Sequence, residues 1–423
     1  MMHWRETIPD WYIKKYGFQP CINIGTAGHV DHGKTTLIQS LTGTWTSVHS
    51  QELKRGITIR VGYSDAAFYK CANCKPPFCY STHNKCPNCN EVTILSRVVS
   101  FVDSPGHESL MANMLSGSAI MDGAMLIIAA NEKEVPKPQT KEHLLALQTL
   151  GITQIVLVQN KVDLINYEDA IKNYHDIKNF IKNTELGSSC PIIPISAQSG
   201  LNVNILIYYI ESTIKTPIRN ESQSSIMHVI RSFDVNKPGT EIANMCGGII
   251  GGSLTRGILK IGDEIEIKPG IFNEKNKSYE TIHTKITSLQ TSAGNVTTAK
   301  PGGLIAIGTK LDPSLTRSDS LIGSVIGQPE TLPESTITAK INVNLFDSAV
   351  GDAEDTKISP IKSGEYLRLN IGTAPILSKV LRSKNNTIDI EFTRPVCIFN
   401  QSNVAISRRI SDRWRLIGAG TVD

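Results

Sequence analysis

The stretch Gly28–Thr35 reads G-H-V-D-H-G-K-T, and it decides the fold of the first part of the chain. A short apolar run before it, Ile22–Gly25, suits a buried parallel strand, and Thr36–Leu41 after it suits a helix. A Gly-x4-Gly-Lys-Thr loop in that setting presents backbone N–H groups at a helix N-terminus, where they can bind phosphate oxygens. The sequence therefore predicts a phosphate loop in a doubly wound α/β domain.

The side chains of this loop have separate predicted tasks. Gly28 and Gly33 permit a tight wrap that a Cβ would obstruct. Lys34 would neutralise oxygens of the β- and γ-phosphates, and the Thr35 hydroxyl would bind Mg²⁺. The alternative is a glycine-rich turn that binds nothing, and the flanking strand and helix argue against it. The loop residues that we expect to bind nucleotide are Gly28, Asp31, His32, Gly33, Lys34, Thr35 and Thr36.

A later segment predicts which base is bound. The apolar run Val156–Val158 leads into the sequence N-K-V-D, at the strand end where parallel sheets bind ligands. The Asp163 carboxylate can accept two hydrogen bonds from guanine, a pattern that adenine lacks, so the sequence predicts GTP. Lys161 can lie over the ring, and the backbone of the S-A-Q sequence can meet the guanine O6. N-K-V-D alone could be a solvated turn, but it follows a phosphate loop. The residues expected at the base are Asn160, Lys161, Asp163, Ser196, Ala197 and Gln198.

Two segments between these motifs fit nucleotide switches. Asp103 opens the sequence D-S-P-G-H after an apolar strand, and we expect it to hold Mg²⁺ through water. Thr58, the last residue of R-G-I-T, would supply a second hydroxyl to the same ion. The N–H of Gly106 can bond the γ-phosphate when that group is present, so its loss would release both segments.

His107 is the candidate catalytic residue. It directly follows Gly106, where an imidazole can orient the attacking water or stabilise charge. A lone histidine is more often structural, but the D-x-x-G-H context favours catalysis.

Together these motifs resemble those of translational GTPases of the elongation factor Tu type. Longer stretches narrow the resemblance to the gamma subunit of archaeal and eukaryotic translation initiation factor two. It spans the chain from about Ile22 to Val422 and implies a GTP hydrolase with an α/β P-loop GTPase domain followed by two all-β barrels. The stretches that carry it are Trp45–Ile59, Ser104–Gly117, Asn131–Leu144, Arg231–Thr240, Gly308–Thr316 and Ser407–Gly418.

The resemblance also implies a function and partners. The chain would be the GTPase of a heterotrimer with alpha and beta subunits, delivering initiator methionyl-tRNA to the small ribosomal subunit. Tyr63 matches a family tyrosine near the pocket for the tRNA acceptor end, although a half-buried strand tyrosine is the plain alternative. Asp31 and Gly56 have the archaeal form, which implies a second Mg²⁺ near the phosphates. GTPase-activating and exchange factors would be partners if the lineage is eukaryotic.

Four cysteines predict a zinc knuckle inserted between the R-G-I-T and D-S-P-G-H segments. Their spacing, C-x2-C-x11-C-x2-C, is that of a four-thiolate site. Disulfides or free thiols are the rivals, but the N-terminal residues lack a secretory signal, which favours a reducing compartment and zinc. Cys79 and His83 lie between the knuckles and could replace a ligand. The expected ligands are Cys71, Cys74, Cys86 and Cys89. The gamma subunit family carries a knuckle here, and elongation factor Tu has none.

Composition suits a cytoplasmic factor. The 423 residues suggest roughly three domains, and no apolar run approaches the ~20 residues of a membrane helix, so we expect no membrane partner. The hydrophobic pattern changes from alternating strands and helices to short strands alone. This change predicts a G domain at 1–218, with the knuckle at about 70–90, and barrels at 226–330 and 334–423. The net charge of +4 is too small to argue for nucleic acid.

Four arginines near Trp414 form a local basic cluster with a single acid, Asp412. One interpretation is an edge strand with protective charges, and the other is a contact with tRNA or a partner. The arginines are Arg408, Arg409, Arg413 and Arg415.

Two competing functions belong to other classes. An elongation-type carrier, such as the selenocysteine-specific factor, is disfavoured by the knuckle and by the lack of a fourth domain in this sequence. A scaffold that binds nucleotide without hydrolysis is disfavoured by the intact Asp103 and His107.

Overall fold

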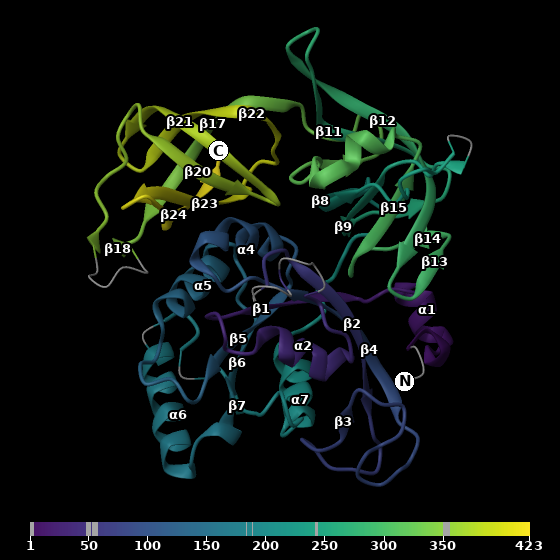
Figure 1. The fold of residues 1–423 in the computed structure, drawn as a ribbon, viewed down its shortest axis with the longest axis vertical. Helices are drawn as coiled ribbons and strands as arrows, with labels where there is room; N and C mark the ends of the chain where they lie inside the picture. Colours follow the sequence, from purple (N-terminus) through teal and green to yellow (C-terminus); the bar gives the residue numbers. More distant parts are fainter. Residues whose placement is uncertain are drawn as a thin grey trace.

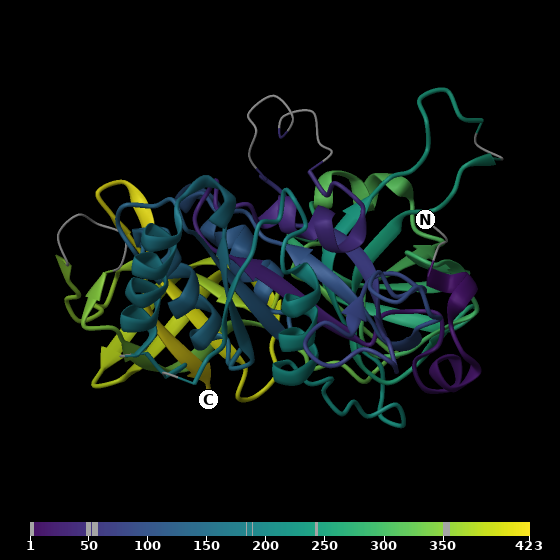
Figure 2. The same ribbon diagram turned by 90° about the horizontal axis from the view of Figure 1, so that it is seen from below.

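In the computed structural model of this chain, the described residues are 4–47, 52, 58–182, 184–187, 189–241, 244–349 and 356–423. They form an α/β domain and two β-barrels, which we call the middle barrel and the last barrel (Figure 1). Both barrels lie on the same side of the α/β domain (Figure 1), one toward each end of the view in Figure 2. This is the fold class that the sequence predicts, and it is confirmed.

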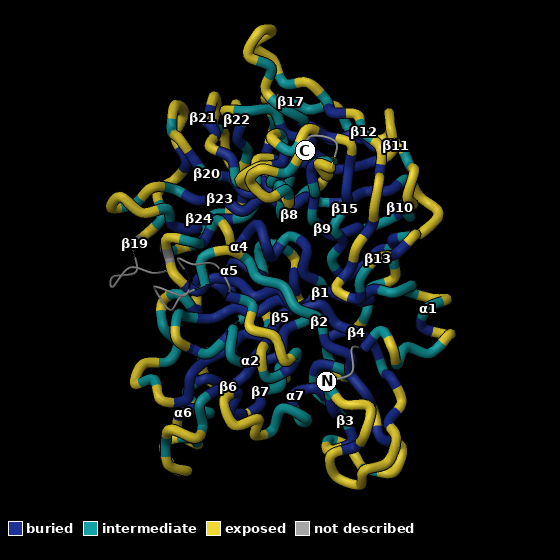
Figure 3. The backbone as a smooth tube through the Cα atoms, turned by 45° about the vertical axis from the view of Figure 1, so that its right-hand side comes forward, coloured by how far each residue is buried: buried dark blue, intermediate teal, exposed yellow. Residues whose placement is uncertain are grey.

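The α/β domain is built on a seven-stranded sheet in the order β3-β2-β4-β1-β5-β6-β7. Strand β1 lies at its centre, parallel to β4 and β5, and is buried along its whole length (Figure 3). Continuous apolar strands are expected where helices cover both faces of a parallel sheet. The strands are β1 (Ile22–Ala27), β2 (Gly62–Lys70), β3 (Tyr80–Ser81), β4 (Ile94–Asp103), β5 (Gly123–Ala129), β6 (Ile155–Asn160) and β7 (Ile192–Pro194).

Helices cover both faces of this sheet. α2 and α7 share one apolar cluster with Ile24 and Ile127, whereas α4, α5 and α6 share a second cluster with Leu126 and Ile128. The domain is therefore doubly wound, as predicted. The helices are α1 (Asp10–Tyr16), α2 (Lys34–Thr42), α4 (Met111–Ser118), α5 (Pro138–Thr149), α6 (Tyr167–Lys182) and α7 (Val203–Thr213), with short 3-10 turns at Trp4–Thr7, Glu108–Leu110 and Val162–Leu164.

The middle barrel is an antiparallel sheet in the order β11-β16-β8-β9-β15-β12-β13, which an additional pairing of β11 with β12 closes. Its apolar core is separate from those of the α/β domain. Its strands are β8 (Ile226–Phe233), β9 (Ile249–Arg256), β11 (Glu264–Asn273), β12 (Ser278–Thr291), β13 (Gly294–Val296), β15 (Ile305–Thr309) and β16 (Val325–Gly327). A short pair, β10 (Leu259–Lys260) with β14 (Thr298–Ala299), and a 3-10 segment, η5 (Pro313–Asp319), complete it.

The last barrel is closed in the order β17-β22-β21-β20-β23-β24. Its strands are β17 (Ser335–Leu345), β20 (Tyr366–Ile371), β21 (Ala374–Lys384), β22 (Thr387–Cys397), β23 (Asn403–Ile410) and β24 (Arg413–Val422), with a small pair β18 (Ser348–Ala349) and β19 (Thr356–Lys357) beside it.

The arginine cluster does not lie on an edge strand. β23 pairs with both β20 and β24, and β24 pairs with both β23 and β17, so barrel closure leaves neither strand with a free edge. That interpretation is therefore wrong. Arg408 pairs with Glu365, and Arg415 faces Glu142 of α5 at 3.6 Å, so part of the cluster holds the last barrel together and fastens it to the α/β domain.

Buried polar contacts join both barrels to the α/β domain. Asn23 of β1 donates a hydrogen bond of 2.9 Å to Ser253 of the middle barrel. Asn370 of the last barrel donates one of 3.3 Å to the carbonyl of Ala112 in α4. α4 and α5 accordingly face the last barrel (Figure 1). Within the part of the chain that the structure describes, no helix is long and apolar enough to cross a membrane.

Candidate functional site

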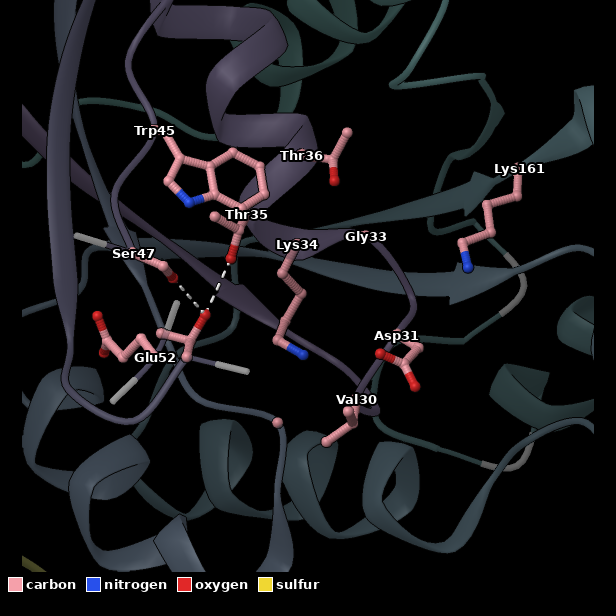
Figure 4. A pocket seen from close by; sticks show the side chains of 12 residues that line it. Val30, Asp31, Gly33, Lys34, Thr35, Thr36, Trp45, Ser47, Glu52 and Lys161 are labelled. Atoms are coloured by element: carbon pink, nitrogen blue, oxygen red, sulfur yellow. Dashed lines mark hydrogen bonds between the residues drawn. The ribbon is translucent and has the colours of Figure 1, made fainter. Parts of the chain in front are cut away.

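The loop between β1 and α2 forms one wall of a cavity of about 460 Å³. Lys34 points into it, with the Trp45 segment on one side and Lys161 on the other (Figure 4). The lining residues are Val30, Asp31, Gly33, Lys34, Thr35, Thr36, Trp45, Ser47, Glu52, Thr58, Gly106 and Lys161. The cavity thus brings together the phosphate loop, both switch segments and the base segment, which are far apart in the sequence.

The Lys34 ammonium group is buried at the floor of this cavity. Its Nζ donates to the carbonyl oxygens of Gly28 at 3.0 Å and His29 at 2.7 Å. Burial lowers its pKa to about 8, although the Asp103 and Asp31 carboxylates act in the opposite direction. Removing an ammonium group from water is costly unless an anion compensates it, so this site fits phosphate oxygens.

Gly106 closes the cavity from the second switch. A Cβ at this position would lie 2.3 Å from Nζ of Lys34 and 2.8 Å from the backbone nitrogen of Val30. Any side chain here would therefore displace the lysine or the loop, so this position requires glycine.

Oxygen atoms converge where the phosphate loop meets the two switches. The Thr35 hydroxyl donates to the Asp103 carboxylate at 2.8 Å and lies 3.0 Å from the hydroxyl of Thr58. Thr46 donates to the same carboxylate at 2.6 Å, and Ser47 lies 3.0 Å from Thr58. A set of hard oxygen donors, one of them anionic, is the ligand type that Mg²⁺ requires. Thr46 and Ser47 lie in the stretch Trp45–Ile59 but outside the nucleotide-binding motifs, so they were not among the predicted Mg²⁺ ligands.

A second cavity of about 220 Å³ continues the first toward the base segment. The two share Gly33, Thr36 and Lys161, so one elongated ligand could occupy both. Lys161 has a φ of 65° and lines both cavities. The lining residues are Gly33, Thr36, Asn160, Lys161, Asp163, Leu164, Ser196, Ala197 and Gln198.

Asn160 is buried, and its side-chain amide forms hydrogen bonds with backbone groups. Its Nδ2 donates to the carbonyl of His32 at 2.9 Å, and its Oδ1 accepts from the N–H of Ala197 at 3.0 Å. A Cβ on Gly33 would lie 2.4 Å from that Nδ2. Asn160 therefore holds three separate segments in register, and its geometry favours positioning over direct contact with a base.

The His32 side chain does not face the nucleotide cavity. Its Nδ1 bonds the carbonyl of Ile127 at 2.9 Å, and burial lowers its pKa to about 4. Only the backbone of His32 is therefore placed to contact a nucleotide. The prediction that His32 binds nucleotide did not say whether its backbone or its side chain would do so. His143 of α5, which was not among the predicted site residues, accepts a hydrogen bond of 2.9 Å from the N–H of Gly28 and so supports the phosphate loop.

His107 lies outside the residues that line the phosphate cavity. Its ring is exposed, and its Nδ1 lies 2.9 Å from the hydroxyl of Ser109. The neighbouring Gly106 does line the cavity. A catalytic His107 must therefore rotate toward the γ-phosphate, and its role stays a prediction.

Four cysteine sulfurs lie close together in the loop beside β3. Figure 3 shows that much of the backbone of this loop is exposed. The Sγ atoms of Cys71 and Cys89 are 3.5 Å apart, and those of Cys74 and Cys86 are 3.6 Å apart. Tetrahedral zinc with bonds of about 2.3 Å would separate its sulfur ligands by about 3.8 Å, so the cluster is compatible with zinc. Among the described residues, this group of four includes neither Cys79 nor His83.

Tyr63 of β2 lines a further cavity, of about 480 Å³, between the α/β domain and the middle barrel. Its phenol oxygen is buried without a hydrogen-bond partner, and burial raises the pKa of the phenol. The other lining residues are Ser64, Asp65, Ile230, Arg231, Phe233, Gly251, Gly252, Gln290, Thr291, Ser292, Leu304, Ile305 and Ala306. Most of this lining is apolar or small, so the cavity suits a flat or aliphatic group.

Part of the predicted site lies outside the described residues. Arg55, Gly56 and Ile57 of the R-G-I-T segment belong to this part, so the ligand expected from Gly56 is untested. Asp31 lines the phosphate cavity at φ 65°.

Comparisons with known proteins agree with this geometry. Residues 19–216 match the model of the elongation factor Tu GTP binding domain, and residues 337–422 match that of the C-terminal part of initiation factor eIF2 gamma. The chain is 52% identical over 403 residues to translation initiation factor 2 subunit gamma of Archaeoglobus fulgidus, which covers 95% of this chain and 94% of the relative. This chain belongs to the family of translation initiation factor 2 subunit gamma. It is a translation initiation factor GTPase that hydrolyses GTP to GDP, and its family implies Mg²⁺.

Other members of the family are similarly close. The subunit gamma of Methanosarcina mazei is 51% identical, with 96% of this chain and 94% of the relative covered. That of Methanocaldococcus jannaschii is 51% identical, with 97% and 99% covered. Identity of this level over nearly the whole of both chains extends the family assignment through both barrels.

Two solved structures share the fold. A bacterial selenocysteine-specific elongation factor has a TM-score of 0.71 at 23% identity, covering 95% of this chain and 58% of that one. Elongation factor SelB of Methanococcus maripaludis, in complex with the GTP analogue GppNHp, has a TM-score of 0.68 at 22% identity, covering 95% and 78%. These similarities concern the fold alone. The elongation-type alternative therefore has less support than the initiation-factor family.

Proposed function

We propose that this chain delivers initiator methionyl-tRNA to the small ribosomal subunit in its GTP-bound state, as the GTPase subunit of a heterotrimer with alpha and beta subunits. The observation that carries the proposal is the convergence of Thr35, Thr58 and Asp103, because it links the nucleotide site to both switches. Translation in the cytoplasm would be its setting. GTPase-activating and exchange factors would join the partners in a eukaryotic lineage.

The nucleotide would bind across the two continuous cavities. Backbone N–H groups of Gly33–Thr35 and the Lys34 ammonium would hold the phosphates, while Asp163 would accept from the guanine edge. Thr35 and Thr58 would bind Mg²⁺, and Asp103 would hold it through water. Bound magnesium would supply positive charge that neutralises phosphate oxygens. Lys161 would lie over the base, and Asn160 would position the loops around it. The remaining proposed contacts are the backbone of Gly28, His32, Thr36, Gly106, Ser196, Ala197 and Gln198.

A second Mg²⁺ would lie beside the first, with the Asp31 carboxylate as a ligand. Asp31 lines the phosphate cavity, which supports this assignment, and Gly56 would contribute its carbonyl. A zinc ion would bind the sulfurs of the four-cysteine cluster, Cys71, Cys74, Cys86 and Cys89. The domain division that we propose is a G domain at 1–218, a middle barrel at 226–330 and a last barrel at 334–423.

The cavity beside Tyr63 would receive the acceptor end of the tRNA. Its apolar lining suits a methionine side chain or the terminal adenine, and a tyrosine ring can stack on a base. Because the cavity lies between the α/β domain and the middle barrel, the arrangement of these two bodies would control access to it.

Binding of tRNA to the assembled heterotrimer tests this function. Initiator methionyl-tRNA should bind more tightly with a non-hydrolysable GTP analogue than with GDP, and elongator tRNAs should compete poorly. Selectivity for selenocysteyl-tRNA instead would favour the elongation-type carrier. Equal affinity in the two nucleotide states would contradict delivery that depends on GTP.

A further inference from the structure

The end of the first switch is held by groups on its own domain. Ile59 and Arg60 directly follow Thr58, and both of their N–H groups donate to one carboxylate oxygen of Glu52 at 2.9 Å. Asn113 of α4, in the helix that follows the second switch, donates to the carbonyl of Ile59 at 3.1 Å. The position of the Arg60 backbone is therefore tied to the Mg²⁺-binding hydroxyl and to the second switch.

The Arg60 side chain crosses to the middle barrel. Its Nη1 lies 3.3 Å from Oδ2 of Asp319, at the end of η5. The other oxygen of Asp319 accepts hydrogen bonds of 3.0 Å from Nε of Arg231 and from the N–H of Ser232. One carboxylate thus bridges a guanidinium group of the switch and one of the barrel.

The bridging carboxylate is held in an unusual local conformation. Asp319 and the preceding Ser318 have φ values of 61° and 56°, in the left-handed region that residues with a Cβ seldom occupy. The Asp319 side chain is 14% exposed, whereas that of Arg60 is 44% exposed. Asp319 is therefore the more buried member of the pair, and Arg60 is the more exposed one.

The barrel arginine of this bridge also lines the cavity of Tyr63. Arg231 lies on β8, and both it and Tyr63 belong to the cavity wall between the α/β domain and the barrel. The two guanidinium groups and one carboxylate of the bridge have a net charge of +1 when Arg60 is in place, beside a cavity wall that also carries the Asp65 carboxylate. Without Arg60, Asp319 and Arg231 neutralise each other.

We propose that Asp319 is a positioning residue that couples the nucleotide state to the acceptor-end cavity. When GTP and Mg²⁺ hold Thr58, Arg60 reaches Asp319, and the bridge then presents one excess positive charge toward the tRNA. When the switch withdraws, Asp319 neutralises Arg231 and the cavity loses its attraction for a polyanion. This inference rests on the proposed function. It adds the residue that couples the position of the first switch to the middle barrel.

Asp319→Asn and Arg60→Ala in the assembled heterotrimer test the proposal. The amide of the Asp319→Asn variant would still present an oxygen to Arg231 and Ser232, so this change removes the charge with little change of shape. Each variant should lower the ratio of initiator-tRNA affinities in the GTP and GDP states roughly fivefold, as expected for one partly exposed ion pair in a network. The double variant should lose no more than either single variant, because both remove the same coupling.

Arg317→Ala is the matched control, because Arg317 is an exposed arginine of the same η5 segment. It should leave the ratio unchanged. Higher ionic strength should reduce the ratio in the wild type more than in Asp319→Asn.

Two outcomes would overturn the coupling role. The ratio could stay at the wild-type value in both variants, or affinity could fall equally with GTP and GDP, which would mean that the bridge only fastens the domains. If the wild type itself failed to distinguish GTP from GDP in tRNA binding, the proposed function would fail instead. Should Asp319→Asn not fold, the exposed Arg60→Ala variant would decide the matter alone.

Discussion

The side-chain amide of Asn160 donates a hydrogen bond of 2.9 Å to the backbone carbonyl of His32, so the base segment and the phosphate loop are fixed to each other. The same side chain accepts from Ala197. The two halves of the nucleotide site are therefore one rigid unit, and damage at this bond should affect every guanine nucleotide alike.

Asn160→Ala should weaken GTP and GDP binding together. Loss of two buried hydrogen bonds costs about 2 kcal/mol, or roughly a 30-fold rise in both dissociation constants. Fluorescent-nucleotide titration measures this. Asn166→Ala is the control, since Asn166 is exposed and bonds Asp169 at the start of α6. A selective loss of GTP over GDP would instead assign Asn160 to the switches.

Asp163→Asn should shift base specificity from guanine toward xanthine. The amide offers a donor where the carboxylate accepts, so affinity for GTP should fall while relative affinity for xanthosine triphosphate rises. Competition between the two nucleotides measures the ratio, with the exposed Asp169→Asn as a control. Identical ratios in wild type and Asp163→Asn would remove Asp163 from base recognition.

The cysteine cluster should carry about one equivalent of zinc in protein purified without chelator. Replacing Cys71 and Cys89 with serine should release it and leave nucleotide binding largely intact, because the cluster organises its own exposed loop. Cys79→Ser should retain the metal, since Cys79 lies in the same loop but outside the group of four. Metal analysis of the wild type without zinc would refute the knuckle.

Acid should destabilise the phosphate loop through His143. Burial lowers the pKa of His143 to about 3 from an ordinary value of 6.5, so the native state binds its proton less readily than the unfolded state. The contribution of the neutral ring to the free energy of unfolding is therefore fully present above pH 6.5. It decreases by about 1.4 kcal/mol per pH unit as the pH falls from 6.5 toward 3.

His143→Gln should flatten this part of the pH dependence, because an amide oxygen can still accept from the Gly28 N–H but does not titrate. Urea unfolding at pH 7, 6 and 5 would measure it, with the exposed His175→Gln as a control. Parallel curves for wild type and His143→Gln would show that other groups set the acid response.

Local patterns predicted much of the fold and of the site, and long-range geometry accounts for the rest. Periodicity and glycine placement suffice for β1, its loop and α2, because those elements depend on neighbouring residues. No local pattern marks His143 or Asp319, which reach the site from other elements. The edge-strand interpretation of the arginines went wrong because barrel closure depends on which strands pair, and a single strand's sequence does not encode that.

Roles within a motif are also decided by tertiary contacts. His32 and Asn160 belong to nucleotide-binding motifs, yet both side chains bond the protein's own backbone. The sequence therefore places both residues in predicted nucleotide-binding motifs, but it cannot separate a residue that touches a ligand from one that shapes the loop around it.

His107→Ala tests the mechanism of hydrolysis. The imidazole follows Gly106 and is exposed, so it can rotate toward the γ-phosphate without displacing a packed side chain. Removing a positioned catalytic group should slow hydrolysis by a factor of roughly 10². GTP affinity should stay near the wild-type value, because Lys34, Thr35 and the loop N–H groups remain. Initiator tRNA should still bind with GTP present, since recognition needs ordered switches and not turnover.

The assay for His107→Ala must use ribosomal complexes or a long single-turnover time course, because intrinsic rates of such GTPases are low without an activating partner. His107→Gln is the informative second variant, since an amide can orient water but cannot become charged. Partial activity in His107→Gln would indicate that the imidazole positions water, and activity as low as in His107→Ala would indicate that its charge matters. Unchanged hydrolysis in both variants would remove His107 from the chemistry, and normal hydrolysis with loss of tRNA binding would make it a residue of the switch.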